Sequence, residues 1–122
     1  MNERVYRRDG FVFSVEQSGE KATVAWKGVC DDRFPGQFVS PLIEEWGEKL
    51  KDFEVTVDLR QLEYMNSAMV MQLINLVKRL DENGNSVTVL FLNVEWQRVH
   101  GTCMAAIART LRNVRVEHQV LP

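Results

Sequence analysis

Asn66 and Ser67 stand directly before the strongest amphipathic helix pattern of the 122-residue chain, at the point where a strand pattern ends. The first backbone N–H groups of a helix lack intrahelical acceptors and carry partial positive charge, so they attract anions. Either side chain can cap the helix, which stabilises it by about 0.5–2 kcal/mol relative to alanine. A phosphoryl group on Ser67 would bring a charge of about −1.5 to −2 to the same amides. The position therefore suits a helix cap and also a phosphorylated serine.

No other group of residues has the spacing of a catalytic or metal site. The seven glycines form neither GxGxxG nor GxxxxGK[ST], and no Gly-x-Ser-x-Gly sequence occurs. His100 and Cys103 could form a thiol–imidazole pair, but we interpret them as a loop residue and a helix residue. We therefore expect no catalytic residue, no metal, no cofactor and no enzymatic activity.

The composition narrows the classes of partner. Fifteen Lys and Arg against seventeen Asp and Glu leave a formal charge of −2, which argues against nucleic-acid binding. Apolar runs end well before the ~20 residues of a membrane span, so we expect no membrane partner. The two cysteines form no CxxC, and the start MNERVYRRDG has no apolar signal segment, so we expect a cytoplasmic protein. The length predicts one domain over residues 1–122.

Hydrophobic periodicity predicts the elements that must hold Ser67 in place. Ser40 as N-cap and Pro41 as first helical residue predict a helix start. Residues 86–92 are almost continuously apolar, which predicts a strand buried on both faces. We expect residues 60–65 to form a loop and 93–101 to be irregular, with Thr102 capping a helix. The expected elements are strands at 10–17, 22–29, 52–59, 86–92 and 114–117, and helices at 40–50, 66–80 and 102–111.

This order of elements predicts an α/β fold. The first two strands are joined by Ser18-Gly19-Glu20-Lys21, which is typical of an antiparallel hairpin. The later strands alternate with helices, and such alternation requires parallel strands joined by right-handed crossovers. The sequence therefore predicts a mixed, mostly parallel β-sheet with an N-terminal antiparallel hairpin and packed helices.

The segment 57–67, VDLRQLEYMNS, followed by an apolar helix and Asn83-Gly84-Asn85, resembles the centre of STAS domains. These domains occur in anti-sigma-factor antagonists and in the cytoplasmic ends of sulfate transporters. The family pattern is a strand ending in Asp-Leu, a short loop with an aromatic residue, and Asp-Ser-Ser-Gly opening a helix. The resemblance covers most of the chain, is most specific from about 54 to 92, and implies a STAS-like fold. The segment near Trp96 is similar to short, stand-alone bacterial members.

The resemblance implies a role for Ser67. In the family, a partner serine kinase of the histidine-kinase-like ATPase type phosphorylates the motif serine and doubles as anti-sigma factor. A serine phosphatase removes the group, and only the unphosphorylated protein binds the kinase. Gly28-Val29-Cys30-Asp31 is similar to the family's Gly-x-Leu-Asp turn, which points to Asp31 as a partner-binding residue.

Three residues of the motif differ from the family pattern. Asn66 replaces the Asp and so removes a negative charge beside Ser67. Ala68 replaces the second Ser, and Met69 replaces the Gly. We expect Met69 to be exposed at the helix start, where it would add apolar contact area for a partner. Asn66, Ala68 and Met69 thus join Asp31 as candidate partner-binding residues.

Three functional hypotheses follow. The first is a phosphorylation-controlled regulator of signal transduction and transcription, switched at Ser67 by the partner kinase and phosphatase. The second is a constitutive scaffold subunit of a signalling complex, in which Ser67 only caps the helix. The third is a sensor of a nucleotide or another small ligand on the same sheet.

Overall fold

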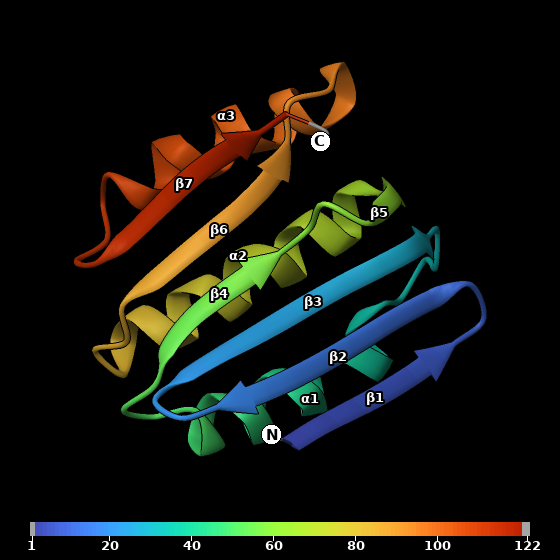
Figure 1. Ribbon diagram of the computed structural model, residues 1–122. Coiled ribbons are helices and arrows are strands. Elements are labelled where there is room, and N and C mark those ends of the chain that lie inside the picture. Colours follow the sequence, from blue (N-terminus) through green and yellow to red (C-terminus); the bar gives the residue numbers. More distant parts are fainter. Residues whose placement is uncertain (1, 121–122) are drawn as a thin grey trace.

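One mixed sheet organises residues 2–120, the part of the chain that the computed structural model describes. Its seven strands run in the order β1-β2-β3-β4-β6-β7, with β5 paired to β3 (Figure 1). The strands are β1 Asn2–Arg8, β2 Phe11–Ser18, β3 Lys21–Cys30, β4 Glu54–Asp58, β5 Leu62–Met65, β6 Val87–Leu92 and β7 Val114–Gln119. The helices are α1 Gly36–Lys49, α2 Ser67–Glu82 and α3 Glu95–Ala108.

The mixed sheet confirms the α/β prediction. Strands β1, β2 and β3 are antiparallel, and the parallel strands β4, β6 and β7 follow one another outward from β3. The three helices of the described residues all cover the same face of the sheet, and none of them lies on its other face (Figure 1). Among the residues that the structure describes, no helix is long and apolar enough to cross a membrane.

The core lies between the sheet and the helices. Phe13 and Trp26 from the hairpin and Phe91 from β6 are its largest fully buried aromatic side chains. The prediction that residues 86–92 are buried on both faces is wrong. Only alternate residues of β6 are buried, because Thr88 and Leu90 lie on the sheet face that no helix covers.

Two strands were missing from the prediction. β1 lies at the edge of the sheet, and its sequence NERVYRR is mostly exposed, so it lacks an apolar alternation. Charged side chains on an edge strand also discourage pairing with another chain. β5 has only four residues, with Leu62 and Met65 buried, which is too short for a periodic pattern.

Two helix starts also differ from the prediction. α1 begins at Gly36 rather than at a Ser40 cap, and Pro41 lies inside it. Burial of Val39 secures the earlier turn, while the Ser40 hydroxyl donates to Gln72 Oε1 at 3.2 Å. The residues from 95 to 101, expected to be irregular, form the first half of α3, which starts at Glu95 rather than at Thr102.

The first half of α3 is fixed by tertiary contacts. Gln97 is buried, its side-chain oxygen accepts from the Leu92 N–H at 2.7 Å, and its amide donates to the Leu59 and Leu62 carbonyls. A Cβ on Gly101 would collide with the imidazole of His118, so glycine permits the close packing of α3 on β7.

Candidate protein-binding surface

Of the two candidate caps, Asn66 is the N-cap of α2. Its backbone is extended, and its side-chain Oδ1 accepts a hydrogen bond from the Met69 N–H at 2.9 Å. Ser67 is therefore the first residue of the helix and is exposed. Within residues 2–120 the Ser67 hydroxyl forms no hydrogen bond. The cap role belongs to Asn66, which leaves the Ser67 side chain available to other molecules.

Asn66 also fastens the loop between β3 and α1. Its Nδ2 donates to the Asp32 carbonyl at 2.7 Å, and its backbone N–H donates to the Cys30 carbonyl at 3.2 Å. Asp32 turns the loop, because its Oδ1 accepts from the Phe34 N–H at 2.9 Å. This loop, residues 31–35, is thus held directly against the start of α2.

Asp31 and Ser67 follow the ends of the paired strands β3 and β5, where Cys30 lies opposite Met65. Both are exposed, and two exposed aromatic side chains lie in the adjoining segments, Phe34 at 67% in the loop and Tyr64 at 49% on β5. We refer to Asp31, Phe34, Tyr64 and Ser67 as the loop–helix surface. Large apolar side chains that stay exposed beside a polar loop are typical of contact surfaces. The sequence signal for Phe34 was a single aromatic residue within an otherwise polar loop.

Met69 lies elsewhere than expected. Its side chain is 0% exposed and packs in the core, so the expectation of an exposed Met69 is wrong. The apolar stripe of α2 includes Met69, Leu73 and Leu76, which face the sheet, while Val70 is only half-buried. Ala68 is half-buried as well. A partner bound at the loop–helix surface would therefore contact Ser67 and the loop rather than Met69.

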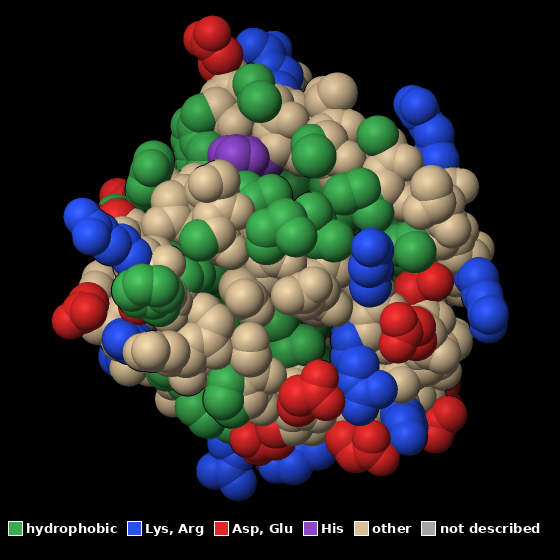
Figure 2. All heavy atoms as spheres, turned by 180° about the vertical axis from the view of Figure 1, so that it is seen from behind, with side chains coloured by type: hydrophobic (Ala, Val, Ile, Leu, Met, Phe, Trp, Pro, Cys, Tyr) green, Lys and Arg blue, Asp and Glu red, His purple; other side chains and the backbone are tan. Residues whose placement is uncertain are grey.

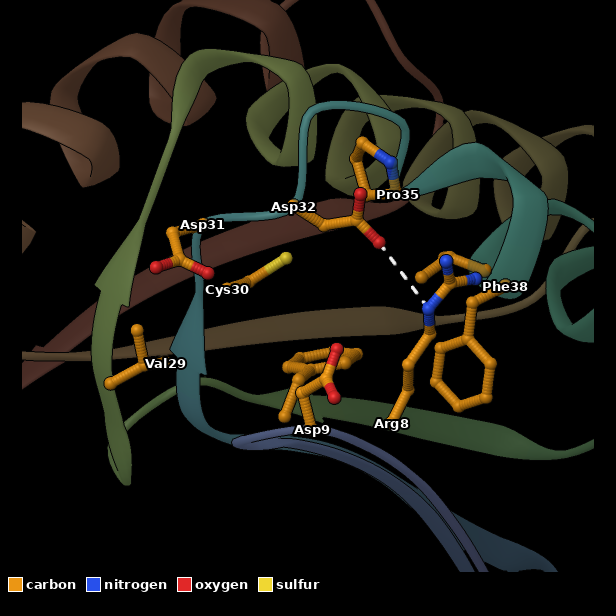
Figure 3. Close-up of a pocket in the computed structure, with 10 residues that line it drawn as sticks. Arg8, Asp9, Val29, Cys30, Asp31, Asp32, Pro35 and Phe38 are labelled. Atoms are coloured by element: carbon orange, nitrogen blue, oxygen red, sulfur yellow. Dashed lines mark ion pairs between the residues drawn. The ribbon is translucent and has the colours of Figure 1, made fainter.

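A pocket of about 190 Å³ lies beside the loop (Figure 3). Arg8 and Asp9 contribute from the β1–β2 turn, and Cys30 and Asp31 from the end of β3 and the loop. Arg8 Nε lies 3.4 Å from Asp32 Oδ2 across the opening. Burial raises the pKa of the Cys30 thiol, and the carboxylates of Asp32 and Asp31 act in the same direction. Cys30 is therefore a neutral thiol at physiological pH.

Among residues 2–120 we find neither a metal-binding cluster nor a hydrogen-bonded His–Cys pair. In the described part of the chain, no three His, Cys, Asp or Glu residues are placed to hold a metal ion. His100 packs edge-on against Trp96, with ring centroids 5.7 Å apart, and burial lowers its pKa. Cys103 is exposed, and no hydrogen bond joins it to His100 within residues 2–120.

On the helix-covered face of the molecule, apolar and charged side chains occupy different areas. Figure 2 shows hydrophobic side chains gathered across the middle of this face and acidic and basic side chains gathered at its lower edge. Within α1, Lys49 Nζ lies 2.7 Å from Glu45 Oε2, while Glu48 pairs with Lys51 and with Arg79 of α2. Val99 on α3 is 66% exposed, and Met71, which lies one turn along α2 from Ser67, is 56% exposed.

Comparisons with known proteins identify the fold but no family. No protein-family model matches the chain, and no curated protein matches it. Among solved structures, it is similar to SiaC in the crystal structure of the diguanylate cyclase SiaD in complex with its activator SiaC from Pseudomonas aeruginosa. The match has a TM-score of 0.70 and 11% identity, and it covers 97% of this chain and 99% of the other. The chain therefore has a SiaC-like fold. At this identity the likeness establishes the fold alone, and the resemblance to STAS domains stays a prediction.

Proposed function

We propose that this chain is a non-enzymatic regulatory subunit that binds a signalling enzyme through the loop–helix surface. The observation that carries the proposal is the exposure of Phe34 and Tyr64 beside Asp31 and Ser67. Aromatic residues are enriched at protein interfaces and often dominate their binding energy. The fold adds support, because SiaC, which matches the chain almost from end to end, is the activator of a diguanylate cyclase.

The test is to identify a partner enzyme and map its binding site on this chain. The partner would be captured on the tagged protein from its own cells, identified by mass spectrometry and purified. We expect Phe34→Ala and Tyr64→Ala each to weaken binding by about tenfold or more in calorimetry, as truncation of an interface aromatic does. The partner's catalytic rate should also change when this chain binds.

Val99→Ala is the matched control. Val99 is as exposed as Phe34 but lies on α3, outside the loop–helix surface. We expect this variant to bind the partner within about twofold of the unchanged protein. Equal losses in all three variants, or none in any, would place the interface elsewhere.

Phosphorylation of Ser67 is the second function that a specific observation favours. Ser67 is exposed at the first position of α2, and its hydroxyl is not used by the cap. A phosphate there would lie against helix amides that favour anions, so it would change the surface without unfolding the domain. The resemblance to STAS domains suggests a serine kinase of the histidine-kinase-like ATPase type and a serine phosphatase as the enzymes that act on it.

This switch has its own experiment. Incubation with the cognate kinase and ATP should add one phosphate to the intact mass, and Ser67→Ala should abolish the addition. Ser67→Asp should weaken partner binding, whereas Ser86→Asp, a charge at an exposed serine before β6, should not. If Ser67→Asp binds normally and no phosphate is added, the chain is a constitutive subunit.

The pocket beside the loop does not favour a nucleotide. Small-molecule sites usually enclose about 300–1,000 Å³. The pocket beside the loop has about 190 Å³, and three of its residues are acidic, which disfavours a phosphate group.

A further inference from the structure

The pocket beside the loop has apolar walls and a charged rim. Phe11, Phe38 and Pro35 supply the walls, and the rings of Phe11 and Phe38 meet edge to face with centroids 6.2 Å apart. Cys30 contributes a neutral thiol to the floor. Such walls favour the aliphatic or planar part of a side chain rather than a hydrated ion.

The rim has an excess of negative charge. Asp9, Asp31 and Asp32 line the pocket together with a single cation, Arg8. Figure 3 shows the carboxylates of Asp9 and Asp31 on different sides of the Cys30 thiol. Only Asp32 forms an ion pair, and within residues 2–120 neither Asp9 nor Asp31 has a cationic partner. The pocket therefore offers two uncompensated carboxylates above an apolar floor.

Arg8 shows how a guanidinium is accommodated. It makes one contact with Asp32, at 3.4 Å, and its side chain is 40% exposed. Exposed pairs of this length contribute little to stability. A second guanidinium would find Asp9 and Asp31 unpaired and an aromatic wall at Phe38 for its planar group.

We propose that this pocket receives an arginine side chain of the protein partner. The inference rests on the proposed function, because the pocket shares Asp31 with the loop–helix surface. Net negative charge, a volume suited to one side chain and an aromatic wall together favour a guanidinium over an anion or a nucleotide. Phe34 and Tyr64 then supply apolar contact, and the pocket supplies orientation and charge selectivity.

The first experiment uses N-acetyl-arginine amide as the probe and N-acetyl-citrulline amide as its neutral isostere. Each is titrated into the ¹⁵N-labelled protein and followed by NMR. We expect saturable shifts at the backbone amides of Asp9, Asp31 and Phe38 with the arginine compound and no saturable shifts with citrulline. Equal shifts with both compounds, or shifts outside the pocket, would overturn the proposal.

Asp9→Asn combined with Asp31→Asn removes the charge and keeps the shape of the rim. This double variant should weaken binding of the arginine compound at least fivefold, and an unchanged affinity would contradict the assignment. Asp52→Asn is the matched control, because Asp52 is, like Asp9, an aspartate with positive φ, at +73° and +53° respectively, but lies outside the pocket. It should bind like the unchanged protein. Asparagine tolerates this conformation, so both variants should fold.

The purified partner separates the two proposals. If Phe34→Ala weakens partner binding and the double aspartate variant does not, the pocket assignment fails and the proposed function stands. If both Phe34→Ala and the double aspartate variant weaken partner binding, the arginine is located by substituting each interface arginine of the partner. One of these substitutions should lower the affinity of the complex as much as the double aspartate variant does. If the partner binds the unchanged protein and none of these variants is weakened, the proposed surface fails together with the pocket.

Discussion

The two ends of the parallel strands use the same residue types differently. Where β6 and β7 begin, the Asp81 carboxylate accepts from the Arg112 and Asn113 N–H groups at 2.9 and 3.1 Å. The Asn85 amide there donates to two main-chain carbonyls, at 2.8 and 2.7 Å. At the opposite end, Asp31 is exposed and has no cationic partner within residues 2–120.

This difference separates structural from functional polar groups. A side chain that forms hydrogen bonds with buried backbone groups supplies the partners that those groups would otherwise lack. A side chain whose polar atoms face solvent is available to a partner. By this criterion the polar groups at the Asp81 end hold the fold together, and those at the loop–helix end are available to the proposed partner.

The largest expected effect comes from breaking the structural end. Asp81→Ala leaves two backbone N–H groups without their acceptor, so we expect a loss of about 2–3 kcal/mol in the free energy of unfolding, measured in urea. Asp31→Ala should change this free energy by less than about 0.5 kcal/mol, because Asp31 is exposed and forms no ion pair with the other described residues. Similar losses in the two variants would remove the distinction between the ends.

Asn66 is the exception at the loop–helix end, since both its amide nitrogen and its amide oxygen form hydrogen bonds with the backbone. Asn66→Ala should cost about 1 kcal/mol of unfolding free energy through loss of the cap. Asn66→Asp keeps the acceptor for the Met69 N–H but loses the donor to the Asp32 carbonyl, so it should fall between Asn66 and Ala. Ser67→Ala serves as the control and should be nearly neutral. A larger loss of unfolding free energy in Ser67→Ala than in Asn66→Ala would show that Ser67, and not Asn66, caps the helix.

Asp58 gives a smaller, pH-dependent effect. Burial alone would raise its pKa, but hydrogen bonds from the Arg60 side chain and N–H and the Arg60 charge outweigh burial and lower it. A lowered pKa in the folded state stabilises the protein above the unfolded value of about 3.9, and this contribution disappears as the pH falls through the folded value.

Asp58→Asn should therefore be less stable than the unchanged protein by about 1 kcal/mol at pH 7. The gap should close as the pH falls below about 3.9, the unfolded pKa of aspartate, and through the lower folded pKa of Asp58. Urea unfolding at several pH values measures it, and Arg60→Ala should show the same trend. A gap that is constant with pH would contradict the ion-pair explanation.

The sequence predicted those features that depend on local chemistry. A cap at Asn66 or Ser67 and a mostly parallel sheet with an N-terminal hairpin follow from helix-end preferences and hydrophobic periodicity, and the structure confirms both, with Asn66 as the cap. The first half of α3 could not be predicted, because Gln97 is secured by carbonyls far away in the chain. The exposure of Met69 was misjudged because the apolar stripe of α2 is wide, and only packing on the sheet decides its centre.

The pocket could not be predicted from the sequence either. Arg8 and Asp9 lie more than twenty residues before Asp31, and the strand that positions them, β1, has no periodic pattern. Asp31 could be chosen because a turn motif contains it. Arg8 and Asp9 reach the pocket because β1 pairs with β2, and the sequence does not predict this pairing.

The double use of the Asn66 side chain has a thermodynamic consequence. One end holds the first turn of α2, and the other holds the Asp32 carbonyl beside the pocket. A phosphate on Ser67 and an arginine in the pocket would therefore act on one shared hydrogen-bonded unit, and the free energy that couples two ligands is the same in both directions. If phosphorylation lowers the partner's affinity by some factor, the bound partner must disfavour the phosphorylated state by that same factor. Binding of the partner would therefore oppose the phosphorylation that weakens the complex.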